Sequence, residues 1–260
     1  MKLISIIIPC LNEQEVIPIF YRTVTEVLDS LENAEYELLF VDDGSDDRLL
    51  RRLVSDDRTL KVLKELKKKD RRCRYLSFTR NFGKEAAIYA GLIHAKGDYV
   101  GLMDVDLQDP PKFLGEMYRT LETGEYDCVA ARRTDRSGER RIRSFFSAMF
   151  YKVINKISKI EFVEGARDYR LMTRKMRDAV LKMGEYNRFS KGLFSWVGFR
   201  TKWLSYHNVE RAAGETKWSF GKLLRYSLDG ILGFSTLPLS LSSYGGIFFC
   251  GAAFLTILFL

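Results

Sequence analysis

The chain has 260 residues, enough for one large domain or a domain with an appendage, and 46% of them are hydrophobic, which excludes a disordered protein. Lys and Arg outnumber Asp and Glu by 42 to 34, and the net charge of +8 suits nucleic acid, an anionic membrane surface or a phosphorylated substrate. The four cysteines lie far apart without CxxC spacing, which favours reduced thiols in a cytoplasmic setting over a metal site.

Short apolar runs alternate with segments of helical periodicity in the first half of the chain. We expect strands at Leu3–Pro9, Glu37–Val41, Arg74–Phe78, Tyr99–Met103 and Asp127–Ala131, and helices at Val16–Leu31 and Lys84–Ala95. This order predicts a doubly wound, mostly parallel α/β sheet of the Rossmann-like kind, whose ligands bind beyond the carboxyl ends of the strands.

Polar residues gather where those strands end, and LMDVDLQDPP at Leu102–Pro111 is the most informative of these segments. Carboxylates at the end of a buried strand can hold a hard divalent cation such as Mg²⁺ or Mn²⁺, whose coordination shell a diphosphate completes. The alternative is an acidic turn in which one Asp caps the next helix. We expect Asp109 to be such a cap. Asp104 and Asp106 are expected at the cation, because a cap needs only one carboxylate.

The second half of the chain is basic and amphipathic. Arg132 and Arg143 belong to a cluster of arginines, and residues 144–160 then place apolar side chains on one helical arc and lysines off it. Such a helix can lie in a membrane interface or pack on the domain. Trp218–Leu232 has the same amphipathic pattern of apolar and basic residues. We find no recognisable nucleic-acid module, so we expect a lipid surface as the partner of this charge.

The C-terminal segment is uncharged from Gly230 to Leu260, and Leu239–Leu260 is long enough to cross a bilayer. A buried core helix is the alternative. Lys217, Lys222 and Arg225 precede the apolar run, which predicts that the globular part lies on the cytoplasmic side. Because the run reaches the last residue without a polar anchor, we expect either a fragment or a protein whose second half lies elsewhere.

Several segments together resemble the family 2 glycosyltransferases, and among them the polyprenyl-phosphate sugar transferases, such as the bactoprenol glucosyltransferases and dolichol-phosphate mannose synthases. The matching segments are IIIPCLNEQE, VDDGSDD, TRNFGKEAAIYAGL, MDVDLQDPP, GARDYRL, NRFSKGLFSWVGF and RAAGETKWSFGKLLRYSLDGILGFSTLPL. The resemblance implies a GT-A fold with amphipathic interface helices and a C-terminal transmembrane segment. It divides the chain into a cytoplasmic catalytic domain (1–212), an interfacial segment (213–236) and a membrane helix (237–260).

The resemblance also implies roles for individual residues. Binding of the nucleotide sugar is implied for Pro9, Leu11, Glu13, Asp42, Arg80, Lys84 and Asp104, with Asp42 reading the base. Asp106 and Gln108 would hold Mg²⁺ or Mn²⁺ on the diphosphate. Arg143 and Ser147 would bind the lipid phosphate, assisted by Arg132. Asp168 would stand beside the reacting centre, so that Asp168, Asp104 and Asp106 form the catalytic set. The longer route from Asp43 to Arg74 departs from the usual pattern.

The activity implied is transfer of a sugar from a nucleotide diphosphate sugar to a polyprenyl phosphate at the cytoplasmic face of the inner membrane, with inversion. We favour UDP-glucose, since the RAAGETKWSF segment is most similar to the bactoprenol glucosyltransferases. Transfer of N-acetylglucosamine, mannose or modified arabinose stays open, as does a homo-oligomer. A processive polysaccharide synthase is disfavoured because the chain has no QxxRW motif. A membrane-tethered scaffold that binds nucleotide sugars without turnover is the remaining alternative.

Overall fold

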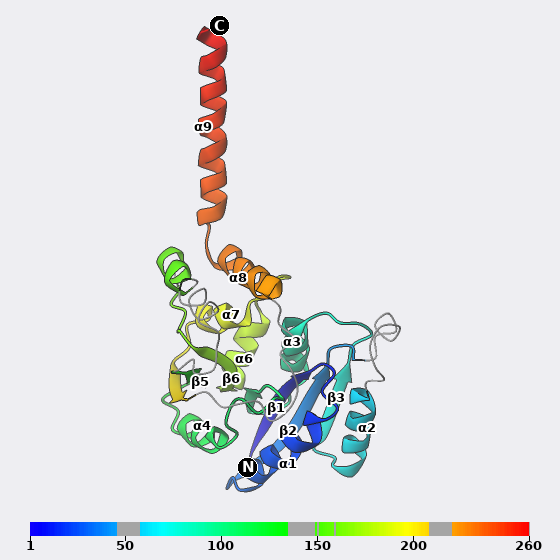
Figure 1. The fold of residues 1–260 in the computed structure, drawn as a ribbon. Helices are drawn as coiled ribbons and strands as arrows, with labels where there is room; N and C mark the ends of the chain where they lie inside the picture. Colours follow the sequence, from blue (N-terminus) through cyan, green and yellow to red (C-terminus); the bar gives the residue numbers. More distant parts are fainter. Residues whose placement is uncertain (46–57, 135–148, 150, 159, 208–219, 260) are drawn as a thin grey trace.

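The structure is a computed structural model that describes residues 1–45, 58–134, 149, 151–158, 160–207 and 220–259 (Figure 1). Within this part of the chain a seven-stranded sheet has the order β3-β2-β1-β4-β6-β5-β7, with helices on both faces. A long helix at the C-terminal end stands away from this domain. The predicted fold class, a mostly parallel Rossmann-like sheet with a C-terminal apolar helix, is confirmed.

One half of the sheet is parallel. It contains β3 (Cys73–Ser77), β2 (Ala34–Asp42), β1 (Lys2–Cys10) and β4 (Tyr99–Leu102). The consecutive isoleucines Ile6, Ile7 and Ile8 of β1 are fully buried, because helices cover both faces of this strand. The parallel arrangement brings the carboxyl ends of β1, β2 and β4 to one edge, and Cys10 pairs with Asp42 there.

The other half contains β5 (Cys128–Arg133), β6 (Ala166–Thr173) and β7 (Thr201–Tyr206). β6 lies between β4 and β5 and is antiparallel to both, whereas β7 is parallel to β5. The hydrophobic pattern does not predict β6, because Arg167, Asp168 and Arg170 interrupt its apolar residues. That interruption places charged groups beside the end of β4.

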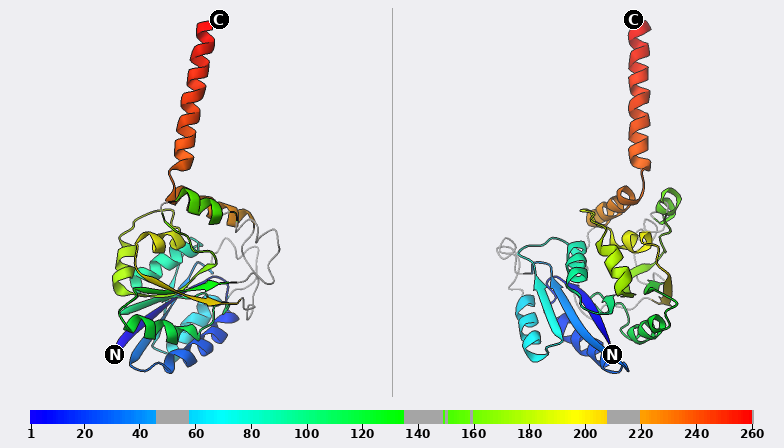
Figure 2. Two further views of the ribbon diagram at one scale, coloured as in Figure 1. Left: turned by 90° about the vertical axis from the view of Figure 1, so that its left-hand side faces the viewer. Right: turned by 180° about the vertical axis from the view of Figure 1, so that it is seen from behind.

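Six helices of the described chain pack against the sheet (Figure 2). One face is covered by α1 (Val16–Asp29), α2 (Thr59–Lys69) and α4 (Phe113–Glu122), whose apolar residues join one core cluster. The opposite face is covered by α3 (Lys84–His94), α6 (Arg174–Leu181) and α7 (Ser190–Trp196), whose residues join a second. Both clusters are needed to bury the two faces of β1 and β4.

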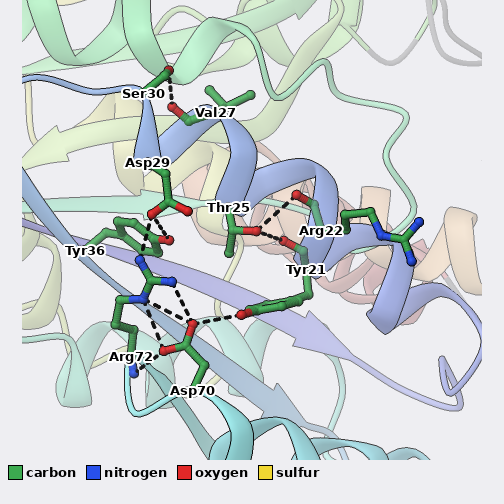
Figure 3. Close-up of polar contacts among 9 residues, drawn as sticks. All are labelled: Tyr21, Arg22, Thr25, Val27, Asp29, Ser30, Tyr36, Asp70 and Arg72. Atoms are coloured by element: carbon green, nitrogen blue, oxygen red, sulfur yellow. Dashed lines mark hydrogen bonds and ion pairs between the residues drawn. The ribbon is translucent and has the colours of Figure 1, made fainter.

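A polar network ties α1, β2 and the α2–β3 turn together (Figure 3). Arg72 lies 2.7 Å from Asp29 and 2.9 Å from Asp70, and its guanidinium stacks on the Tyr36 ring at 4.4 Å. Tyr36 donates to Asp29 and Tyr21 donates to Asp70. The hydrogen bonds and the charge of Arg72 hold the pKa of both carboxyls below the ordinary 3.8.

The C-terminal part consists of α8 (Phe220–Phe234) and α9 (Leu237–Phe259). α9 is 23 residues long with a mean hydropathy of 1.7, and none of its side chains is buried in the described structure. It is therefore not a core helix, and by length and composition it can cross a membrane. Figures 1 and 2 show it extending away from the domain.

α8 is attached to the domain through aromatic contacts. Phe234 packs against Phe162, Phe189 and Trp196, with ring centroids 5.7–6.2 Å apart. A β-carbon added to Gly192 of α7 would lie 2.3 Å from the Phe234 ring. The backbone of α7 and the end of α8 are therefore in direct contact.

The predicted amphipathic helix at residues 144–160 is partly described, because residues 144–148, 150 and 159 lie outside the described residues. Residues 151–157 are helical, and Ile154 is fully buried against the domain, whereas Val153 remains 42% exposed. This short helix therefore both packs on the domain and leaves apolar surface uncovered.

Candidate active site

The predicted nucleotide pocket lies at the carboxyl ends of β1 and β2. Pro9, Leu11 and Glu13 are half-buried there, and the Glu13 N–H donates to Thr59 Oγ1 at 2.9 Å, which fastens the loop after β1 to the first residue of α2. The structure brings these three residues and Asp42 to one edge of the sheet. Their contacts with a nucleotide remain predictions.

Asp42 and Asp43 have different surroundings although they are neighbours. Asp42 is fully buried, and its carboxylate accepts from the Ser45 N–H at 3.0 Å and from the Ser77 hydroxyl at 2.9 Å. Asp43 accepts from the N–H groups of Phe82 at 2.7 Å and Gly83 at 2.9 Å. Burial raises the pKa of Asp43, although those two bonds oppose the shift. Asp43 thus holds the loop that leads into α3.

The loop that leads into α3 contacts the turn after β2 so closely that residue 44, in that turn, has no room for a side chain. Gly44 has φ = +77°, and a β-carbon there would lie 2.3 Å from the carbonyl carbon of Arg80. The Arg80 side chain is exposed, and its guanidinium stacks on the Phe82 ring at 4.6 Å. Arg80 therefore lies at the rim of this edge of the sheet.

Lys84 joins two of the predicted catalytic carboxylates. Its ammonium nitrogen lies 2.7 Å from Asp104, at the end of β4, and 2.6 Å from Asp168, on β6. All three side chains are between 15% and 29% exposed, so the cluster is largely shielded from water. The structure thus brings together residues from three segments that are remote in sequence.

Electrostatics in this cluster favour the charged forms. Burial by itself raises the pKa of Asp168, but the ammonium groups of Lys84 and Lys191 outweigh it and hold the pKa well below its ordinary value. For Lys84 the directions are reversed. Burial lowers the pKa of its ammonium group, but the carboxylates of Asp104 and Asp168 outweigh burial and hold this pKa well above its ordinary value. Asp168 is therefore an anion across the physiological pH range and a weak proton acceptor.

Asp106 and Gln108 follow Asp104 in a tight turn. Leu107 takes a left-handed conformation with φ = +56°, and the Gln108 N–H donates to Asp106 Oδ1 at 3.2 Å. Asp104 and Asp106 both interact electrostatically with the guanidinium of Arg167. The two carboxylates predicted at the cation therefore both lie near Arg167.

The prediction that Asp109 caps the following helix is wrong. α4 begins at Phe113, its N-cap is Lys112, and no side chain caps it. Asp109 is instead fully buried and accepts from Arg167 Nε at 3.1 Å and from the Tyr206 hydroxyl. A buried carboxylate needs a charge partner, and Arg167 of β6 supplies it. Asp109 thus fixes Arg167 beside the acidic turn.

A divalent cation fits the donor set of this turn only together with a ligand. Among the described residues, no group of three His, Cys, Asp or Glu side chains could hold a metal ion alone. Mg²⁺ and similar ions are commonly held by one or two carboxylates plus substrate phosphates. Asp106, with Asp104 and Gln108 beside it, supplies hard oxygen donors of that kind.

The predicted lipid-phosphate residues are only partly described. Arg132 lies on β5 with its side chain exposed, and its Nε donates to Ser205 Oγ at 2.9 Å. Arg143 and Ser147 fall outside the described residues. Their part in the site therefore stays a prediction.

Three residues that contact or influence the candidate site were not among the predicted residues. Arg167 is the cation beside the acidic turn, and Lys191 is the second cation that acts on Asp168. Glu85 accepts hydrogen bonds from the backbone N–H and hydroxyl of Ser190, which ties the first turn of α3 to the first turn of α7. The segments GARDYRL, NRFSKGLFSWVGF and TRNFGKEAAIYAGL contain Arg167, Lys191 and Glu85 respectively, but their contacts are long-range and the motifs do not indicate them.

Comparison with known proteins identifies the family of the chain. The sequence model described as glycosyl transferase family 2 matches residues 5–53 and 54–181. A protein of Escherichia coli (strain K12) described as a prophage bactoprenol glucosyl transferase homolog is 41% identical over 252 residues, which cover 97% of this chain and 78% of the relative. The bactoprenol glucosyl transferase of Shigella phage SfV has the same identity and coverage.

A solved structure supports the fold. Glucosyl-3-phosphoglycerate synthase from Mycobacterium tuberculosis, crystallised with Mn²⁺, UDP-glucose and phosphoglyceric acid, superposes with a TM-score of 0.53 at 20% identity, covering 88% of this chain and 77% of that one. Because the family model covers most of the chain and the relatives match it almost from end to end, the chain belongs to glycosyl transferase family 2 and is a glycosyltransferase of the GT-A fold.

Proposed function

We propose that this glycosyltransferase transfers glucose from UDP-glucose to a polyprenyl phosphate at the cytoplasmic face of a membrane, with inversion at the sugar C1. The observation that carries the proposal is the Lys84, Asp104 and Asp168 cluster at the carboxyl end of β4, in a chain that also has an unburied helix long enough to span a bilayer. The names of the relatives, which are bactoprenol glucosyl transferases, suggest the acceptor.

The donor is expected to lie along the edge formed by β1, β2 and β4. Pro9, Leu11, Glu13 and Asp42 would hold the nucleoside, and the diphosphate would extend toward the turn at Asp104 and Asp106. A bound Mg²⁺ or Mn²⁺ would neutralise the charge that develops on the departing diphosphate. Asp106 and Gln108 are the residues expected to hold it.

The cluster around Asp168 would orient the reacting groups. Leaving-group departure builds positive charge at the sugar C1, and an anionic Asp168 beside it stabilises that charge. Its low pKa makes Asp168 a poor general base. A phosphate acceptor needs none, since phosphomonoesters with a second pKa of about 6 are largely dianionic near neutral pH. Asp168 would therefore orient the reacting groups and would not abstract a proton.

The direct test is sugar transfer with the full chain in detergent. Radiolabelled UDP-glucose, undecaprenyl phosphate and Mn²⁺ or Mg²⁺ should give a lipid-linked glucose, and NMR of the product should show an anomeric configuration opposite to that of the donor. UDP-N-acetylglucosamine, GDP-mannose and a nucleotide-linked arabinose serve as competing donors. Absence of lipid-linked product with every donor and both metals would overturn the proposed acceptor.

A further inference from the structure

A pocket of about 320 Å³ is lined by residues of α7 and by Ala166 and Arg170, which stand two positions before and after Asp168 on β6. The roles predicted for the site residues do not account for it. Its walls include the side chains of Phe162, Phe194, Phe199 and Trp203, and its charged lining consists of Lys191, Arg170 and Glu161. Two cations and one anion around an aromatic cavity fit a ligand that has an anionic head and an apolar body.

Lys191 is the cation of this pocket that is available to a ligand. In the described part of the chain its ammonium makes no hydrogen bond or ion pair, and it acts on Asp168 electrostatically. Arg170, by contrast, is 3% exposed, donates to the carbonyl groups of Asp168 and Arg167, and stacks on the Phe194 ring at 3.9 Å. Arg170 thus builds the pocket wall, whereas Lys191 faces into it.

The position of Lys191 is set by its neighbours in α7. Ser190, the residue before it, is bonded to Glu85, which follows Lys84 in α3. Lys84 and Lys191 therefore approach Asp168 from two helices that are linked to each other. The pocket is in this way connected to the carboxylate predicted to stand beside the sugar C1.

One wall of the pocket adjoins the end of α8, next to the helix that can span a membrane. Phe162 in its wall packs on Phe234, the last residue of α8, and α9 begins three residues later at Leu237. Figures 1 and 2 show α7 between the sheet and α8. An apolar chain that leaves the pocket on this side would therefore meet the elements nearest the bilayer.

We propose that this pocket receives the head of the polyprenyl phosphate, with Lys191 bonded to the phosphate and the aromatic walls around the first isoprenyl units. The inference rests on the proposed function and extends it by assigning an acceptor subsite outside the predicted set of Arg132, Arg143 and Ser147. A sugar is a poorer occupant, because its hydroxyl groups need more polar partners than these walls offer.

In this arrangement the sugar is transferred by a single displacement at C1. An oxygen of the phosphate dianion attacks the sugar C1, the bond from C1 to the diphosphate oxygen breaks, and its electron pair leaves with the nucleoside diphosphate. No proton is transferred. Lys191, on the phosphate side of Asp168, would hold the attacking oxygen on the face of the sugar opposite the leaving group.

The first experiment separates acceptor from donor effects. In the full chain, Lys191→Gln should raise the KM for undecaprenyl phosphate by about tenfold or more, the loss expected for a charge-assisted bond to phosphate, and leave the KM for the nucleotide sugar unchanged. Ser195→Phe, which fills the pocket from α7, should do the same. Lys182→Gln, at an exposed lysine after α6, is the matched control. A rise in donor KM alone would overturn the subsite.

A second experiment does not depend on turnover. A farnesyl phosphate with a photoreactive group on its first isoprenyl unit is cross-linked to the full chain, and the adduct is mapped by mass spectrometry. Adducts on Phe194, Phe199 or Trp203, reduced in Lys191→Gln, support the subsite even if no sugar is transferred. Adducts confined to other segments overturn it even if transfer to undecaprenyl phosphate succeeds.

Discussion

Lys84 and Asp168 lie 84 positions apart in the sequence, and an ion pair of 2.6 Å joins Nζ of one to Oδ2 of the other. The contact joins the first turn of α3 to β6, the antiparallel strand inserted beside β4. Lys84 also bonds Asp104, so one ammonium group balances two carboxylates that would otherwise repel each other.

Replacing Lys84 should impair catalysis and change its pH dependence. Lys84→Met removes the main positive charge that keeps Asp168 ionised, while burial, which raises the pKa, remains. We expect kcat/KM to fall by about 100-fold or more, as for the loss of a preorganised charged group. We also expect the acid limb of the pH profile to move to higher pH. Both are measured by steady-state kinetics.

Two variants control this experiment. Lys84→Arg keeps the positive charge and should keep the acid limb near its wild-type position even if the rate falls. Lys64→Met removes an exposed lysine from α2 and should behave as wild type. An acid limb that stays in place in Lys84→Met would show that Lys84 does not control the ionisation of Asp168.

Asp106 is expected to govern the metal requirement. Asp106→Asn removes a negative oxygen ligand, so the Mn²⁺ concentration for half-maximal activity should rise by about tenfold or more. Calorimetry should show that Mn²⁺ no longer strengthens UDP binding. Glu116→Gln, an exposed change on the neighbouring α4, should leave both quantities unaltered. Metal-dependent UDP binding at wild-type strength in the Asn variant would remove Asp106 from the metal site.

The contact between α7 and α8 predicts an unusual substitution pattern. Gly192→Ala should lower the free energy of unfolding by about 1–3 kcal/mol, because the new methyl group would collide with the Phe234 ring. In a Phe234→Ala background the same change should be neutral or slightly stabilising, since Ala has the higher helix propensity. Thermal unfolding of the wild type, the two single variants and the double variant in detergent completes the double-mutant cycle.

Gly184→Ala is the matched control for this cycle, because a β-carbon at Gly184 meets nothing within 4 Å. It should leave the unfolding temperature unchanged. If Gly192→Ala were equally destabilising with and without the Phe234 ring, the contact would not be the cause.

The network around Arg72 should make stability depend on pH. The folded-state pKa values of Asp29 and Asp70 are lowered, so their contribution is fully present above 3.8 and is lost as the pH falls below it. Arg72→Ala should cost about 1 kcal/mol at pH 7, since these side chains are partly exposed, and progressively less in acid. Denaturant unfolding at several pH values measures this, with the exposed Arg71→Ala as the reference. A cost independent of pH would contradict the assignment.

The parallel half of the fold is predictable because its strands are buried on both faces and read as continuous apolar runs. The predicted Leu3–Pro9, Glu37–Val41 and Tyr99–Met103 match β1, β2 and β4 closely. β6 and β7 were missed, because charged residues interrupt the first, and the TKWLSY of the second is neither a continuous apolar run nor a strict alternation. Hydrophobic pattern alone cannot identify a strand whose function is to carry charges.

The site was predicted as a list of residue types and not as contacts. The motifs named Asp104, Lys84 and Asp168, which the structure places in contact, but no spacing rule indicates that Lys84 would pair with Asp168 or that Glu85 would bond Ser190. Asp109 illustrates the limit: next to two prolines it has the local signature of a cap, yet its partner Arg167 lies 58 residues away. For Asp109, pairing with a distant charge determined the position of the side chain, and the local preference for a helix cap did not.

Gly44 limits how far this protein can be varied. Its missing side chain leaves the space taken by the backbone at Arg80, and its φ of +77° is one that other residues rarely adopt. A library built to alter donor choice can therefore diversify the rims of the site but must leave this position untouched. A side chain at residue 44 would displace the loop before α3, and with it Lys84, which contacts Asp104 and Asp168.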